Sequence, residues 1–181
     1  MVGKLAVLIS LLLLIFHKGE HVSFASLPGM WERTLTLSSS GKTFSNTGWK
    51  VGWAIGPAHL VKAVAAVQQW VNFSIATPNQ EAIADCLVEA ENPYAHEGES
   101  YDSYYEYLSA SYKEKRNLLI SALQSANITP IVPNGGFFII GDTSKLICPE
   151  SYLNEVTEAS HVPMTRDWAL SRFLTKGKAF C

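Results

Sequence analysis

The segment Ser39-Ser-Gly-Lys-Thr-Phe-Ser-Asn-Thr-Gly-Trp-Lys-Val-Gly52 is the most informative part of this 181-residue chain. It places Lys42 in a serine-rich turn and a second lysine, Lys50, eight residues later. Gly41 and Gly48 remove side chains where a backbone turns sharply or approaches a ligand. The segment therefore predicts a loop that gathers two amines and several hydroxyl groups around one small ligand.

This arrangement suits the chemistry of pyridoxal phosphate. An aldehyde cofactor needs a primary amine that can form an imine, and among side chains only lysine provides one. The phosphate group of the cofactor needs hydroxyl donors and a fixed cation, which Ser39 and Lys50 can supply. We therefore predict Lys42 as the catalytic lysine, with Lys42, Ser39 and Lys50 as the cofactor-binding residues.

The same segment has two other possible interpretations. A Gly-Lys-Thr triplet such as Gly41-Lys-Thr43 also ends a P-loop, but that motif needs a glycine five residues earlier, where this chain has Thr36. A P-loop is therefore excluded. The second interpretation is that Lys42 and Lys50 are solvated surface residues beside a turn, which is the usual state of lysine. Spacing alone does not separate this interpretation from a cofactor site.

Three longer segments carry a family resemblance: Leu27-Pro-Gly-Met-Trp-Glu-Arg-Thr-Leu35, Gly41-Lys-Thr-Phe-Ser-Asn-Thr-Gly-Trp-Lys-Val-Gly-Trp53 and Pro133-Asn-Gly-Gly-Phe-Phe-Ile139. From about residue 21 to residue 177 the chain resembles the fold type I, class I aminotransferases. Within them it is similar to the kynurenine aminotransferase and cysteine S-conjugate β-lyase group, which commonly has lysine at position 50 where many class I relatives have arginine. The resemblance implies that Lys42 forms the Schiff base and that Ser39 and Lys50 contact the phosphate.

The resemblance also implies an activity and an assembly. The activity is pyridoxal phosphate-dependent transfer of an amino group from an aromatic or sulfur-containing amino acid to a 2-oxo acid, with β-elimination of cysteine conjugates at the same site. The family forms homodimers, in which the stretch around Phe73 reaches the active site of the partner subunit. Phe73 is therefore a candidate substrate neighbour, although an aromatic residue at such a position more often serves packing alone.

The expected fold class is α/β, a partial fold type I aminotransferase. We expect a leader unlike the family over residues 1–20, the C-terminal part of the large cofactor-binding domain with an incomplete sheet over 21–100, a long connecting helix over 101–126, and a truncated α+β small domain over 127–181. A family subunit is more than twice as long as this chain and has two domains. The N-terminal half and the C-terminal end, which hold further cofactor- and substrate-binding residues, are expected to be missing. The alternative function is therefore an inactive truncated product or gene-model fragment that is at most an interaction partner.

Hydrophobic periodicity predicts the individual elements. Strands are expected at Thr34–Leu37 and Lys50–Ile55, and a hairpin is expected to turn at 133–136 and continue as a strand over 137–140. Helices are expected at 57–71, with Leu60, Val61, Val64, Val67 and Val71 facing the core, at 77–92, at 101–125 and at 166–174. In the second helix, Thr77 is the expected N-cap, Gln80 completes a capping box, and Ile83, Ala84, Leu87 and Val88 face inward.

Composition excludes several function classes. The chain is 48% hydrophobic and 17% charged, with a net charge of −2, so it has no basic surplus for nucleic acid or anionic lipid. Its three cysteines and five histidines show no metal-ligand spacing and no disulfide framework. We therefore expect no metal and a reducing compartment, which the resemblance narrows to the cytoplasm or mitochondria.

The N-terminus points to a different compartment. Leu5–Phe16 is an apolar run too short to span a bilayer, which is typical of a signal-peptide core, and a cleavage site follows Ala25. Secretion or membrane association is therefore the alternative localisation, and Asn72 and Asn127 would then be glycosylation acceptors. That cleavage site falls inside the region that resembles the family. We favour a misplaced gene boundary or an alternative exon over secretion.

Overall fold

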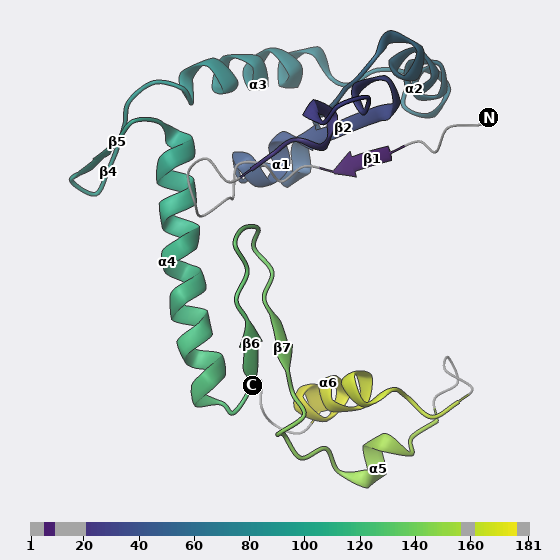
Figure 1. Ribbon diagram of the computed structural model, residues 1–181, viewed down its shortest axis with the longest axis vertical. Coiled ribbons are helices and arrows are strands. Elements are labelled where there is room, and N and C mark those ends of the chain that lie inside the picture. The colour runs from purple at the N-terminus through teal and green to yellow at the C-terminus, as the bar shows by residue number, and fades with distance from the viewer. Residues whose placement is uncertain (1–5, 10–20, 157–161, 177–181) are drawn as a thin grey trace. The chain divides into compact units, whose positions relative to one another are not determined.

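The computed structural model describes residues 6–9, 21–156 and 162–176, which divide into two compact units (Figure 1). The first unit contains the described residues up to Lys115 together with Asn134–Phe137. The second contains Arg116–Pro133 and the described residues from Phe138 onward. The candidate lysines and Phe73 all belong to the first unit.

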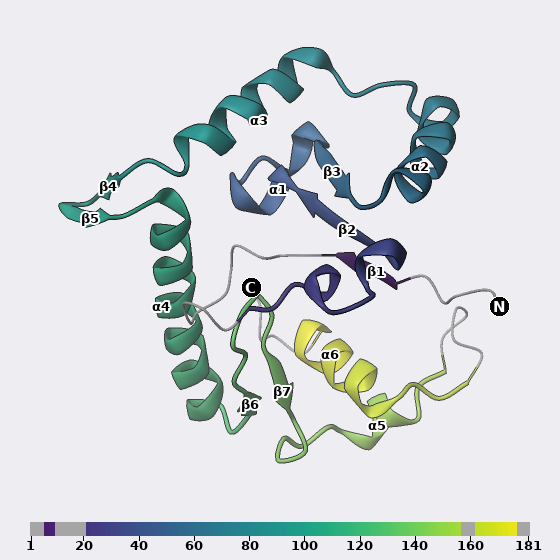
Figure 2. The same cartoon turned by 45° about the horizontal axis from the view of Figure 1, so that its top comes forward.

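A three-stranded sheet organises the first unit, in the order β1 (Ala6–Ile9), β2 (Thr34–Ser39), β3 (Gly52–Ile55). β1 runs parallel to β2, and β3 runs antiparallel to it (Figure 2). At the end of β2, Ser39 pairs with Gly52. The strand that leads to Lys42 therefore has a hydrogen-bonded neighbour on each side.

The predicted strands are confirmed with shifted ends. β2 extends two residues beyond the predicted Leu37, whereas β3 starts at Gly52 and not at Lys50. Lys50 has a left-handed backbone (φ 57°) and follows the short 3-10 helix η4 (Thr47–Trp49). A residue in that conformation cannot continue an extended strand, so the prediction for the first two residues is wrong.

The apolar leader contributes β1 to the sheet. Ala6–Ile9 pair with residues 34–37 of β2, while the rest of the predicted signal core lies outside the described residues. The short 3-10 helices η2 (Phe24–Ser26) and η3 (Trp31–Arg33) precede β2. Within the described ranges, no helix has the length and apolar character needed to cross a bilayer.

Helix α2 (Ala58–Val71) has nearly the predicted bounds, but its packing differs from the prediction. Leu60, Val61 and Val64 are only partly buried, and Val67 and Val71 are 61% and 70% exposed. Within the described part of the first unit, the apolar face on the second half of this helix lies open.

Helix α3 (Thr77–Glu89) starts one residue earlier than predicted. The carbonyl of Ala76 accepts the first helical hydrogen bonds, so Ala76 is the N-cap. The side chain of Gln80 donates to the carbonyl of Ile75 at 2.9 Å, and no hydrogen bond closes the predicted capping box with Thr77. The capping-box prediction is therefore wrong.

The inward face of α3 is narrower than predicted, and the helix ends at Glu89, earlier than the predicted 92. Ile83 is buried and Leu87 is partly buried, as predicted. Ala84 and Val88 are exposed, because the described chain packs on one edge of this helix only.

A hairpin that the sequence did not predict connects α3 to the long helix α4 (Tyr104–Ser125) (Figure 1). Its strands are β4 (Tyr94–His96) and β5 (Glu99–Tyr101), and Glu97 and Gly98 between them both have positive φ, at 51° and 87°. Two successive positive φ values define the tight turn that suits the twist of a hairpin. Tyr101, the predicted first residue of the long helix, is therefore the end of a strand.

The second unit contains the rest of α4, strands β6 (Thr129–Ile131) and β7 (Ile140–Asp142), and helices α5 (Glu150–Leu153) and α6 (Arg166–Lys176). The prediction of a hairpin in this region is confirmed, because β6 and β7 pair in antiparallel orientation. The predicted strand over 137–140 is wrong except at its last residue, because the connection between the strands is longer than a tight turn. The predicted C-terminal helix is confirmed and extends two residues further.

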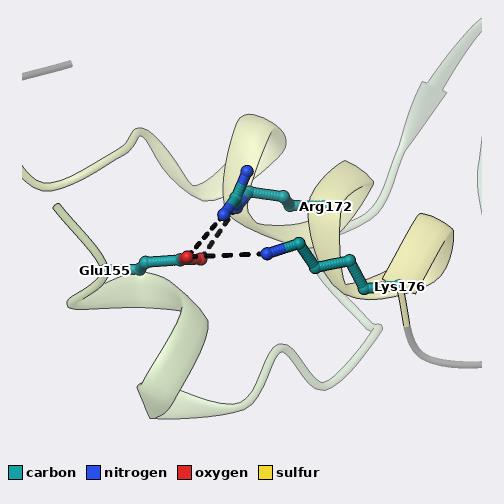
Figure 3. Close-up of polar contacts among 3 residues, drawn as sticks. All are labelled: Glu155, Arg172 and Lys176. Atoms are coloured by element: carbon teal, nitrogen blue, oxygen red, sulfur yellow. Dashed lines mark hydrogen bonds and ion pairs between the residues drawn. The ribbon is translucent and has the colours of Figure 1, made fainter. Parts of the chain in front are cut away.

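A charged cluster joins α6 to the segment after α5 (Figure 3). Arg172 donates to the carboxylate of Glu155 from Nε at 2.8 Å and from Nη2 at 2.5 Å, and Lys176 Nζ lies 3.7 Å from the same carboxylate. The hydrogen bond from Arg172 lowers the pKa of Glu155, and burial acts in the opposite direction. This cluster fixes α6 in the second unit.

Candidate active site

Lys42 lies on α1 (Ser40–Thr43), a one-turn helix that follows β2 directly. Ser39 is the N-cap of this turn, and its hydroxyl accepts a hydrogen bond from the backbone N–H of Gly41 at 3.2 Å. The Lys42 side chain is exposed, whereas Ser40, Gly41 and Thr43 are buried. The fold therefore holds the turn by its small residues and leaves the amine accessible.

Ser40 ties this turn to the residue after Lys50. Both its backbone N–H and its hydroxyl donate to the carbonyl of Val51, each at 3.1 Å. Ser40 is fully buried and Val51 is also a core residue. These two hydrogen bonds, together with the strand pairing beside them, hold the Lys42 turn and the Lys50 segment at the same end of the sheet.

Gly41 permits a close approach of two backbone segments. A Cβ at this position would lie 3.2 Å from the Cα of Thr47, which is tighter than most real contacts allow. Gly41 lies in the predicted turn, and its lack of a side chain serves a close approach of the chain to itself. Gly48 lies in the 3-10 helix η4, so the turn is present there too, although no atom lies within 4 Å of an added Cβ. The approach of either glycine to a ligand stays a prediction.

Lys50 and Phe73 line a common cavity of about 380 Å³ beside β2, β3 and the end of α2. Both residues have left-handed backbones, with φ of 57° and 61°. This conformation is uncommon for residues other than glycine, and such strain is concentrated at functional sites. The other lining residues include Ser38, Trp53, Gln68, Asn72 and Ile75.

The amine of Lys42 lies against an aromatic ring that the sequence analysis did not assign to the site. Lys42 Nζ is 5.4 Å from the centroid of the Phe137 ring, within the range of a cation–π contact. Phe137 belongs to the Pro133–Ile139 segment that carried the family resemblance, but periodicity alone gave it no role. Ser40 was missed as well, because nothing in the run Ser38–Ser40 distinguishes one serine from the next.

The structure therefore places Ser39 and Lys42 at the same turn, whereas Lys50 and Phe73 line the same cavity. Their roles toward a cofactor or a substrate stay predictions. The donor set suits pyridoxal phosphate, because it offers an accessible primary amine, a hydroxyl and a second cation. In the same loop, the buried side-chain oxygen of Asn46 has no hydrogen-bond partner among the described residues, so it can accept one from a bound molecule. Within the part of the chain that the structure describes, no group of three potential metal ligands is present.

Comparison with known proteins identifies the family. A profile described as aminotransferase class I and II matches residues 16–172. The kynurenine–oxoglutarate transaminase of Dictyostelium discoideum is 42% identical over 160 residues, covering 88% of this chain and 35% of the relative. Kynurenine–oxoglutarate transaminase 3 of Mus musculus is 40% identical over 169 residues, covering 91% of this chain and 34% of the relative.

A solved structure shows the same fold. YbdL from Escherichia coli, for which a methionine aminotransferase function is reported, superposes with a TM-score of 0.73 at 26% identity, over 95% of this chain and 38% of its own. This chain thus spans about a third of the length of its curated relatives. The similarities confirm the predicted partial fold type I architecture and the resemblance to the kynurenine group. The chain belongs to the class I and II aminotransferase family.

Proposed function

We propose that this chain provides the cofactor-binding lysine of a pyridoxal phosphate-dependent transaminase of the kynurenine–oxoglutarate type. The observation that carries the proposal is the anchored turn at the end of β2, which exposes the Lys42 amine and is tied through Ser40 to the segment of Lys50. The names of the relatives at 40% and 42% identity support the choice of reaction.

The three predicted cofactor-binding residues each have a role in this proposal. Lys42 holds the cofactor through its ε-amine, while the Ser39 hydroxyl and the Lys50 ammonium bind the phosphate group. When bound, the cofactor supplies an aldehyde and an electron-withdrawing ring. The amino group of the substrate would replace Lys42 on the cofactor, and the freed Lys42 Nζ would then remove the proton from the α-carbon of that amino acid. If that substrate carries a leaving group on its β-carbon, loss of the same proton permits elimination.

The proposal includes a homodimer. Val67, Trp70 and Val71 are spaced as neighbours on one side of the second half of α2, and Trp70 and Phe73 are each 86% exposed. An open apolar face of this kind is typical of an interface. A second copy that covers it would also enclose the cavity of Lys50 and Phe73. Sedimentation equilibrium of the purified chain should show a dimer, and a monomer at all concentrations would contradict this part.

The same exposed face favours a second candidate function, in which the isolated chain is catalytically inactive and only binds a partner. The transaminase and the inactive binding protein differ in whether the isolated chain converts substrate. Strong conversion of kynurenine and 2-oxoglutarate by the isolated chain, abolished in Lys42→Ala, would refute inactivity.

Cofactor titration tests the proposed role of Lys42 directly. Pyridoxal phosphate added to the purified chain should give a visible absorbance band, weak in the isolated chain, that Lys42→Ala abolishes. Lys62→Ala is the matched control, because Lys62 is an exposed lysine on α2 outside the site. An unchanged band in Lys42→Ala would refute the assignment.

A further inference from the structure

The turn that carries Lys42 needs support at its C-terminal end. A helix of one turn is not stable alone, and its last carbonyl groups have no partner within the helix. At its beginning the turn is held by Ser39 and by the bonds from Ser40 to Val51. At its end, the support must come from elsewhere in the fold.

Tyr104, the first residue of α4, provides this support. Its hydroxyl donates a hydrogen bond to the carbonyl of Thr43 at 2.8 Å. Its ring also stacks on Phe44, with centroids 5.7 Å apart and an interplanar angle of 23°. One side chain thus contacts both residues that follow Lys42, from a position 61 residues away from Thr43.

Tyr104 is itself held in place from several sides. Its backbone N–H donates to the carbonyl of Ala90 at 3.0 Å, which fixes the start of α4 to the end of α3. The ring of Tyr94 meets its ring edge-on at 5.3 Å, and Tyr107 lies 6.0 Å away. Burial raises the pKa of the Tyr104 hydroxyl further above neutral, and the group is a proton donor at neutral pH as in any ordinary tyrosine.

We propose that Tyr104 is a positioning residue that sets the direction of the Lys42 amine by holding the carbonyl of Thr43 and the ring of Phe44. The inference rests on the proposed function of Lys42. Without the hydroxyl of Tyr104, the last carbonyl of the turn loses its partner, the turn opens, and the amine leaves its place against the Phe137 ring.

The test measures how reactive Lys42 is in the full chain without cofactor. Trinitrobenzenesulfonate labels exposed lysines, and peptide mapping gives the labelling rate of Lys42 relative to Lys62. Tyr104→Phe removes only the hydroxyl, and we expect it to raise this ratio by about two- to tenfold, the range that corresponds to one net hydrogen bond. Tyr105→Phe is the matched control, because the Tyr105 hydroxyl donates to Leu87, away from the lysine turn. It should leave the ratio within about twofold of the unmodified chain.

Two further measurements separate positioning from general stability. Phe44→Leu removes the stacked ring but keeps the Tyr104 hydroxyl, and it should change the labelling ratio in the same direction. With pyridoxal phosphate added, the visible circular dichroism should weaken in Tyr104→Phe and not in Tyr105→Phe. If Tyr104→Phe does not fold, Phe44→Leu decides the question.

The outcomes for the inference and for the proposed function are distinct. The inference is overturned if Tyr104→Phe has the same labelling ratio as Tyr105→Phe. If Tyr104→Phe does not fold, the same comparison is made between Phe44→Leu and Tyr105→Phe. Failure of the unmodified chain to hold the cofactor on Lys42 refutes the proposed function instead, because the labelling experiment contains no cofactor.

Discussion

Gly56 is the position at which a single methyl group should disturb the sheet most. It follows β3 directly and lies against the start of β2. A Cβ at Gly56 would lie 2.7 Å from the carbonyl oxygen of Thr34 and 2.9 Å from Cδ2 of Leu35, both shorter than real Cβ contacts. Thr34 is completely buried in the central strand. Its carbonyl therefore cannot move unless the end of β3 separates from β2.

The magnitude follows from comparison with Gly48, where an added Cβ has nothing within 4 Å. Overpacking against a rigid neighbour costs about 1–3 kcal/mol of unfolding free energy. Gly48→Ala meets no obstacle, and reduced freedom of the unfolded chain should stabilise it by about 0.4–1 kcal/mol. Both variants lose the same freedom in the unfolded chain, so this gain cancels, and Gly56→Ala should be less stable than Gly48→Ala by about 1–3 kcal/mol.

Urea unfolding followed by tryptophan fluorescence measures this difference, since the chain has five tryptophans. Far-ultraviolet circular dichroism in the absence of urea confirms that both variants fold. If Gly56→Ala is as stable as Gly48→Ala, or more stable, the described contact between β3 and β2 is wrong, and so is the placement of Lys50 that depends on it.

Two other predictions concern the remaining parts of the chain. Because the hydrogen bond from Arg172 lowers the pKa of Glu155, the stability that it provides should be fully present above the ordinary glutamate pKa of about 4.3 and should be lost as pH falls through the lowered value. The unfolding temperatures of the unmodified chain and of Glu155→Gln should therefore differ most near neutral pH and become equal in acid. A difference in unfolding temperature that stays constant across pH would contradict the described ion pairs of Glu155. Removal of residues 1–20 should leave β2 without its parallel neighbour, so light scattering should show faster aggregation than in the complete chain. Equal scattering would mean that β1 does not protect this edge.

The elements that the sequence predicted well are those with strong local patterns. The β-branched run before Ser39 forms β2, and the long stripe after residue 101 forms α4, because periodicity alone specifies both. The Lys42 turn was predicted from residue chemistry, and the structure adds the reason for its shape, which is the anchoring of Ser40 on Val51.

The errors arise where a local pattern allows more than one hydrogen-bonding partner, or where the partner is remote in the sequence. Gln80 had the right spacing for a capping box with Thr77, but the N-cap is Ala76, and the Gln80 side chain donates to the carbonyl of Ile75. The hairpin at Glu97 and Gly98 was missed because its strands are three residues long and lack clear alternation. Tyr104 looked like one member of an aromatic stripe, since its partner Thr43 is remote in the sequence. Local patterns contain no information on such pairings.

The proposed function depends most on Lys42 as the covalent attachment point of the cofactor. Borohydride reduction of the chain with pyridoxal phosphate, followed by proteolysis and mass spectrometry, locates the pyridoxyl group on a single peptide. We expect the label on Lys42, and we expect Lys50 and Lys62 to be unlabelled. A label on another lysine, with Lys42 unmodified, would contradict the central claim.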